Sequence, residues 1–315
     1  MTTFAGPNIG SYITGVGPAS SFNQPTGVAV DDAGNVFVAD QGNNVIRKIS
    51  PSGIVTTLAG NGHIGSTDGL STAASFNAPI GIALDAVGDV YVTEYLGYRL
   101  RIIRQDYVAQ DYIVNTYATN IEYAYGVAVD TIGEAANVYV SNFGTYQIGH
   151  ITPSGDMIPL AGNGIGSTNG PGYAAKFDGP AGIAFDIVGN IYVADKYNNV
   201  IRKISSSGVV TTFAGDGSVG SDNGVGTTAA SFTNPTGVAV DKAGNVYVAD
   251  QGNNLIRKIS PAGAVSWLAG TGQIGSANGP GYAASFNHPS GVAVDDSGNV
   301  YVADTDNNMI RKISQ

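Results

Sequence analysis

Short apolar runs separated by turn residues recur along the whole chain. In the first copy the runs occupy 27–31, 36–40, 45–49 and 54–58, and every gap between them contains Gly together with Asn or Ser. Runs of this length, rich in Val, Ile, Phe and Tyr and bounded by turn residues, are typical of β-strands. Four such strands joined by short turns predict an antiparallel meander. No segment shows a sustained 3.6-residue apolar period, so long helices are not expected.

The same meander recurs six times. The string Gly-Val-Ala-Val-Asp or a variant of it has spacings of 54, 45, 56, 55 and 54 residues and begins at Gly27, Gly81, Gly126, Gly182, Gly237 and Gly291. Six copies of a four-stranded meander predict an all-β fold, a six-bladed β-propeller with these strands innermost. We expect residues 1–315 to form this single domain.

The two ends of the chain are predicted to share the last blade. The sixth copy stops after its third strand, and residues 2–6 match the fourth-strand strings of the other copies. The N-terminal strand should therefore be the outer strand of the sixth blade. Such closure removes the open sheet edge that an unclosed array of repeats would expose.

The repeat pattern resembles the NHL-repeat family. It reads Pro-x-Gly-Val-Ala-Val-Asp-x-x-Gly-Asn-Val-Tyr-Val-Ala-Asp-x-x-Asn-Asn-x-Ile-Arg-Lys-Ile, followed by Val-Thr-Thr-Leu-Ala-Gly. The resemblance covers essentially the whole chain, and it is weak only in the third copy. It implies a six-bladed NHL propeller. Propellers of this kind include RNA-binding modules, sensor domains, protein- and cell-contact domains and a few lyases and hydrolases, so the fold alone does not name an activity.

The composition narrows the classes of partner. With 14 Lys and Arg against 24 Asp and Glu the net charge is −10, which argues against a nucleic-acid partner because phosphate binding needs a basic surface. No apolar run is long enough to insert into a membrane. The first residues read as a strand rather than a signal peptide, which leaves open a mature or an excised extracellular domain. The compartment and the oligomeric state stay open.

Most of the recurring polar residues are predicted to stabilise the blades rather than to bind a ligand. An acid ends the second strand in five copies, and the third strand of the same five copies carries an Arg; the third copy has Asn142 and Gly149 at these two positions. Acid and Arg are lost together, which predicts an ion pair within each of the five blades, since an unpaired buried charge is costly. The predicted pairs are Asp40–Arg47, Glu94–Arg101, Asp195–Arg202, Asp250–Arg257 and Asp304–Arg311.

Departures from the repeat indicate where a ligand would bind. Residues 91–146 hold ten of the 17 tyrosines, the long Gly-rich crossover between the second and third blades is missing, and an insertion occurs at 131–136. Tyrosine is enriched in recognition sites because it offers a large amphipathic surface at low entropy cost. The candidate ligand-binding tyrosines are Tyr95, Tyr98, Tyr123, Tyr125 and Tyr146.

A second set of candidates precedes the inner strands and should surround the channel mouth. It includes Gln24, Asn234 and His288 as ligand-binding residues, with Glu122 and Asp178 as an alternative site for calcium or a similar cation. The leading prediction is a binding propeller for a protein or glycan, without a cofactor and acting through the loop-rich face near the second and third blades. The alternative is a cation-dependent lyase or hydrolase with its site at the channel mouth, although no catalytic motif occurs.

Overall fold

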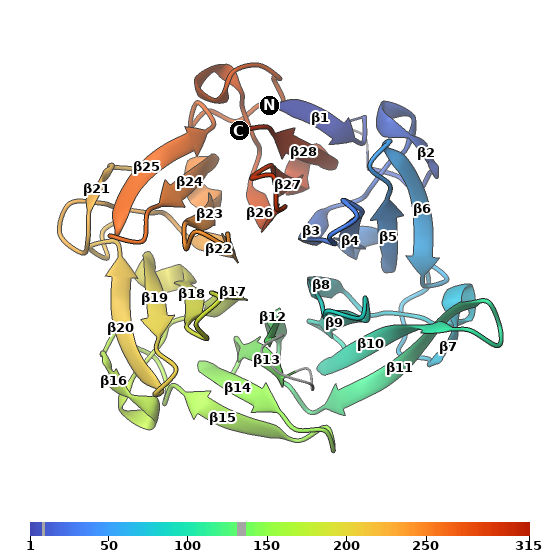
Figure 1. The fold of residues 1–315 in the computed structure, drawn as a ribbon, viewed down its shortest axis with the longest axis horizontal. Coiled ribbons are helices and arrows are strands. Elements are labelled where there is room, and N and C mark those ends of the chain that lie inside the picture. The colour runs from blue at the N-terminus through green and yellow to red at the C-terminus, as the bar shows by residue number, and fades with distance from the viewer. Residues whose placement is uncertain (8–9, 131–136) are drawn as a thin grey trace.

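The computed structural model describes residues 1–7, 10–130 and 137–315, which form six blades around a central channel (Figure 1). Every blade is an antiparallel sheet of four main strands. The predicted all-β, six-bladed propeller is confirmed. The insertion noted at 131–136 lies outside the described residues.

The main strands run in order from the channel to the rim. The inner strands are β3 (Pro25–Val30), β8 (Pro79–Leu84), β12 (Ala124–Asp130), β17 (Pro180–Phe185), β22 (Pro235–Val240) and β26 (Pro289–Val294). The second strands are β4 (Val36–Asp40), β9 (Val90–Glu94), β13 (Asn137–Asn142), β18 (Ile191–Asp195), β23 (Val246–Asp250) and β27 (Val300–Asp304). The third strands are β5 (Val45–Ile49), β10 (Arg99–Asp106), β14 (Gln147–Ile151), β19 (Val200–Ile204), β24 (Leu255–Ile259) and β28 (Met309–Ile313). The outer strands are β6 (Ile54–Ala59), β11 (Asp111–Thr119), β15 (Met157–Ala161), β20 (Val209–Ala214), β25 (Ala264–Ala269) and β1 (Thr2–Ala5).

Short elements occupy the loops of one face and the rim. Two-residue strands extend the outer edges of four blades: β2 (Gly15–Val16), β7 (Gly69–Leu70), β16 (Gly170–Pro171) and β21 (Gly224–Val225). Single 3₁₀ turns lie in the crossovers and in the second-to-third-strand loops: η1 (Gly17–Ala19), η2 (Gln41–Asn43), η3 (Ser71–Ala73), η4 (Gly172–Ala174), η5 (Lys196–Asn198), η6 (Gln251–Asn253), η7 (Gly281–Ala283) and η8 (Thr305–Asn307). In the described part of the chain no helix is long and apolar enough to cross a membrane.

The sixth blade is closed by both ends of the chain, as predicted. Strand β1 pairs with β28, with Thr2 opposite Lys312 and Thr3 opposite Arg311, and the N- and C-termini lie close together in Figure 1. Met1 exchanges two hydrogen bonds with Gly279, of 2.7 and 3.1 Å. Met1 therefore takes the outer-strand position at which Val55 pairs with Gly15 in the first blade.

The five predicted ion pairs are all present and fully buried. The N–O distances are 3.1 Å for Arg47–Asp40, 3.0 Å for Arg101–Glu94, 2.8 Å for Arg202–Asp195, 2.9 Å for Arg257–Asp250 and 2.6 Å for Arg311–Asp304. In the third blade the side chain of Met157 fills the space beside Gly149, where a Cβ would lie 2.4 Å from the Met157 methyl carbon. An apolar side chain thus replaces the ion pair, so the third blade remains packed without it.

Candidate functional site

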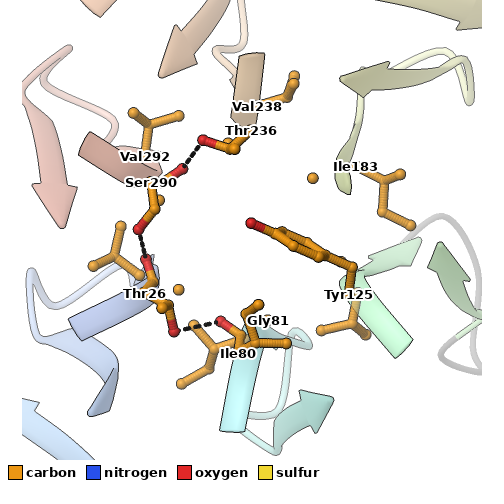
Figure 2. Close-up of a pocket in the computed structure, with 17 residues that line it drawn as sticks. Thr26, Ile80, Gly81, Tyr125, Ile183, Thr236, Val238, Ser290 and Val292 are labelled. Carbon is orange, nitrogen blue, oxygen red and sulfur yellow. Dashed lines mark hydrogen bonds between the residues drawn. The ribbon is translucent and has the colours of Figure 1, made fainter. Parts of the chain in front are cut away.

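The central channel is narrow because the six inner strands approach one another closely. A Cβ on Gly27 would lie 2.4 Å from the carbonyl oxygen of Ile80 in the next blade, and the corresponding glycines meet similar contacts. Glycine is required at this repeat position because no side chain fits between the backbones. Near the start of the inner strands the channel cavity has a volume of about 70 Å³ and is lined among others by Thr26, Ile80, Tyr125, Thr236 and Ser290 (Figure 2). Farther along the same strands the channel holds a second cavity of about 430 Å³.

Hydroxyl groups join neighbouring inner strands around part of the channel (Figure 2). Thr26 donates to the carbonyl oxygen of Ile80 at 3.1 Å, Thr236 to that of Ser290 at 3.0 Å, and Ser290 to that of Thr26 at 3.1 Å. These side chains are engaged in holding the ring of blades together. They are therefore scaffold rather than free ligand-binding groups.

Tyr125 occupies the equivalent position in the third blade but takes no part in these bonds. The hydroxyls of Thr93 and Ser141, on the second strands of their blades, donate instead to Tyr125 O at 2.6 Å and Ala181 O at 2.5 Å. The ring of Tyr125 points toward the middle of the channel in Figure 2. Burial raises the pKa of Tyr125, so its hydroxyl stays protonated at neutral pH and is available as a donor.

Tyr125 belongs to a continuous layer of aromatic side chains over the second, third and fourth blades. The ring centroids lie 5.1 Å apart for Tyr95–Tyr123, 6.2 Å for Tyr95–Tyr125, 5.8 Å for Tyr125–Phe143 and 5.7 Å for Phe143–Tyr197. Separations of this size are the favourable range for aromatic pairs. Burial is the largest cause of the raised pKa of Tyr125, and the neighbouring phenols of Tyr95 and Tyr197 raise it further. We call these five residues the aromatic layer.

The other blades present polar side chains where the layer has Tyr95 and Phe143. This position directly follows the second strand and holds Gln41, Tyr95, Phe143, Lys196, Gln251 and Thr305. Thr305 shows that this repeat position lies at the channel mouth. Its hydroxyl donates to Pro25 O at 2.8 Å and lies 2.6 Å from the Ser290 hydroxyl, and both partners are at the start of inner strands. By this equivalence Gln41 and Gln251 also follow their second strands at the channel mouth, in the first and fifth blades.

Lys196 is the cationic member of this set of positions. Within the described residues it forms no ion pair, and burial lowers its pKa. Its ammonium nitrogen lies 5.8 Å from the centroid of the Tyr197 ring. The fourth blade thus contributes both a ring and a positive charge beside the aromatic layer.

The predicted ring before the inner strands shares one backbone conformation. Its φ angles lie between 49° and 67° for Gln24, Ala78, Tyr123, Gly179, Asn234 and His288. The N–H groups of Gln24, Asn234 and His288 donate to asparagine side chains of the preceding blade at 2.8–2.9 Å. None of these three lines the channel cavity, which begins two residues later. They lie on the outer rim of the mouth, and their role in ligand binding stays a prediction.

Tyr98 and Tyr146 replace the asparagines that accept those bonds. Both have left-handed backbone, with φ of 53° and 60°, a conformation that Asn adopts more easily than Tyr. Tyr98 packs edge-on against Tyr123 at 5.1 Å. Tyr146 makes no such contact with any described ring. The structure therefore brings Tyr95, Tyr98, Tyr123 and Tyr125 together and leaves Tyr146 apart.

Glu122 and Asp178, the alternative cation ligands, lie in different loops. Glu122 is exposed in the short link before β12, whereas the backbone N–H of Asp178 donates to Asp195 at 2.7 Å. Within residues 1–7, 10–130 and 137–315 no three His, Asp or Glu side chains gather in a group that could hold a metal ion. A cation at these two residues stays a prediction.

Sequence reasoning missed Phe143, Lys196 and Tyr197. The signal was present, because Phe143 and Lys196 follow the second strand at the same repeat position as Tyr95. At this position the second, third and fourth blades carry Tyr, Phe and Lys, whereas the first, fifth and sixth blades carry Gln, Gln and Thr. This difference alone would have identified Phe143 and Lys196 as candidates. The concentration of tyrosines in residues 91–146 predicted a site on the second and third blades and did not include the fourth.

Comparisons with known proteins agree with the fold. The NHL repeat model matches residues 22–49, 232–259 and 286–313. The chain is 29% identical to Protein SUPPRESSOR OF QUENCHING 1, chloroplastic, of Arabidopsis thaliana, over 92% of this chain and 30% of that protein. It is 27% identical to human NHL repeat-containing protein 2, over 98% of this chain and 41% of that protein. The chain thus spans less than half the length of either relative.

A solved structure of an auxiliary nutrient binding protein from Bacteroides ovatus is also similar. The two chains are 17% identical and superimpose with a TM-score of 0.75, covering 100% of this chain and 76% of that chain. At this level of identity the likeness shows a shared fold.

Proposed function

Because the chain carries NHL repeats and folds as a six-bladed propeller, we propose that it is a binding protein whose loop-rich face recognises a glycan or a protein. The observation that carries the proposal is the two-sided channel mouth. Aromatic rings cover the second, third and fourth blades, and Gln41 and Gln251 occupy the repeat position of Tyr95 in the first and fifth blades. Binding sites commonly combine an aromatic wall with a few placed polar groups.

A glycan fits this arrangement better than a flat protein surface does. The apolar face of a sugar ring packs on an aromatic side chain, and its hydroxyls exchange hydrogen bonds with amides and phenols. The raised pKa of Tyr95, caused by burial and by the hydroxyls of Tyr197 and Tyr123, keeps that phenol protonated as a donor. The name of the Bacteroides ovatus neighbour, an auxiliary nutrient binding protein, is consistent with a small-molecule or glycan ligand.

The test uses residues that the chain itself carries at the same repeat position. Replacing Tyr95 and Phe143 by Gln gives the second and third blades the side chain of Gln41 and Gln251, so folding should be preserved. We expect affinity in a glycan and surface-protein array to fall by at least about tenfold, since buried aromatic contacts dominate recognition. Melting temperature should change little.

A matched control keeps the mouth intact. Tyr282 is 82% exposed in the crossover before the sixth blade, outside the aromatic layer, and Tyr282→Ser should leave binding unchanged. Equal binding by the wild type and the doubly substituted Tyr95→Gln, Phe143→Gln chain would reject the proposed site. If the chain binds proteins but no glycan on the array, the ligand is a protein rather than a glycan.

A further inference from the structure

The short link between the second and third blades leaves a hollow in the loop-rich face. Only residues 120–123 connect β11 to β12, whereas residues 60–78 connect the first blade to the second. A cavity of about 310 Å³ lies at this place, lined by Tyr98, Asn120, Glu122 and Tyr123. The cavity is continuous with the aromatic layer through Tyr123, whose ring contacts both Tyr95 and Tyr98 at 5.1 Å.

Two aromatic rings and one carboxylate form the walls. The rings of Tyr98 and Tyr123 meet at 83°, which makes a corner open to solvent. Glu122 is exposed and forms no ion pair with any described residue. Glu122 and Tyr98 line the same cavity, and the pKa of Tyr98 is raised by hydrogen bonding to Tyr123, then by burial, with a smaller contribution from the charge of Glu122.

The backbone around the cavity is left-handed at three residues. Tyr98, Asn120 and Tyr123 have φ of 53°, 60° and 51°, so three of the four lining residues are left-handed without being glycine. In four other blades the equivalent of Tyr98 is Asn, and Asn44 for example accepts the N–H of Ala78 at 3.0 Å. With Tyr98 in this place, the N–H of Tyr123 has no partner among the described residues. The left-handed backbone of Tyr98 and Tyr123 recurs at the same repeat positions in every blade, so it belongs to the scaffold and what distinguishes this cavity is the tyrosine side chains.

We propose that the cavity lined by Tyr98, Asn120, Glu122 and Tyr123 binds an ammonium group of the ligand. Aromatic faces attract cations through their quadrupole, and a carboxylate beside them completes the charge match. The net charge of −10 favours the approach of a cationic group as well. The inference rests on the proposed role of the loop-rich face in ligand binding, and it adds a charge requirement that the aromatic layer alone does not impose.

Choline and its neutral isostere 3,3-dimethyl-1-butanol test the proposal directly. The two probes have the same shape, and only choline carries a charge. Titrations of tyrosine-labelled protein at low salt, followed by NMR, should show choline binding at least about fivefold more tightly, with shifts at Tyr98 and Tyr123. Equal affinities of the two probes would overturn the proposal.

Two substitutions separate charge from shape. Glu122→Gln should weaken choline binding by about two- to fivefold and leave the isostere unaffected, because only the charge is removed. Asp32→Asn, which neutralises an exposed carboxylate in the β3–β4 turn, is the matched control and should change neither. If Asp32→Asn weakens choline binding as much as Glu122→Gln does, net charge rather than this cavity is responsible.

Tyr98→Asn removes one wall without threatening the fold, because four other blades carry Asn at this position. The variant should melt at the same or a higher temperature and lose choline binding. Retained choline binding by a folded Tyr98→Asn chain would contradict the proposal. If the wild type binds choline and its neutral isostere equally while array binding still depends on Tyr95 and Phe143, the ammonium site is rejected and the proposed function stands.

Discussion

Deleting residues 1–6 is expected to lower the free energy of unfolding by about 2–7 kcal/mol, because roughly four or five backbone hydrogen bonds worth about 0.5–1.5 kcal/mol each are lost. The deletion removes β1, its pairing with β28 and the two bonds between Met1 and Gly279. It also removes Ala5, which is fully buried, and Phe4, whose ring lies 5.4 Å from that of Tyr301. A loss of this size is large beside a typical total stability of about 5–15 kcal/mol.

The bared edge of β28 should also promote aggregation, since unpaired N–H and C=O groups invite pairing between molecules. Thermal unfolding and light scattering of the truncated chain measure both effects. Appending Ser-Gly-Val-Thr-Thr-Phe-Ala-Gly after Gln315 supplies the same strand from the other terminus and should restore most of the stability. A melting curve that does not move on deletion would mean that β1 does not close the ring.

Breaking one buried ion pair should have an effect of similar size. Asp250→Ala is expected to cost about 3–5 kcal/mol, because it strands the charge of Arg257 in the interior. Asp250 also accepts the N–H of Thr233 at 2.8 Å and the side-chain amide of Asn253 at 2.8 Å, so three donors lose their partner together. Urea unfolding at neutral pH measures the loss.

The third blade suggests the compensating change. Where the other blades have an acid and an Arg, the third blade has Asn142 and the side chain of Met157 beside Gly149. The double variant Asp250→Asn, Arg257→Met should therefore be more stable than Asp250→Ala alone. Asp296 pairs with Lys242 on the surface at 2.5 Å, both largely exposed, so Asp296→Ala should lower the free energy of unfolding far less than Asp250→Ala does. Strictly additive losses for the two changes at 250 and 257 would contradict the pairing argument.

Periodicity carried the fold prediction because every blade repeats the same local rules. The joint loss of acid and Arg in the third copy was enough to predict which side chains pair, although no distance was known. The closing strand could be predicted because residues 2–6 repeat the outer-strand string. These inferences succeeded because they depend on contacts within one repeat, whose spacing along the chain is fixed.

The candidate site was harder to predict because it is formed between repeats. Whether Tyr95 meets Tyr125 or Tyr146 depends on how the loops of neighbouring blades approach one another, and the chain spacing does not fix that approach. Phe143 and Tyr197 join the aromatic layer from positions that are Gln and Gly, respectively, in the first and fifth blades. Tyr146 was grouped with the others by composition, yet it makes no ring contact with any described aromatic side chain, and composition carries no information on such contacts.

A crystal structure of the chain with its strongest ligand from the glycan array would test the central claim most directly. We expect the ligand to lie at the channel mouth, packed against Tyr95, Tyr125 and Phe143 and within hydrogen-bonding distance of Gln41 or Gln251. A ligand found on the opposite face, beside the β3–β4 turn and its equivalents, or along the outer strands with the mouth unoccupied, would contradict the account.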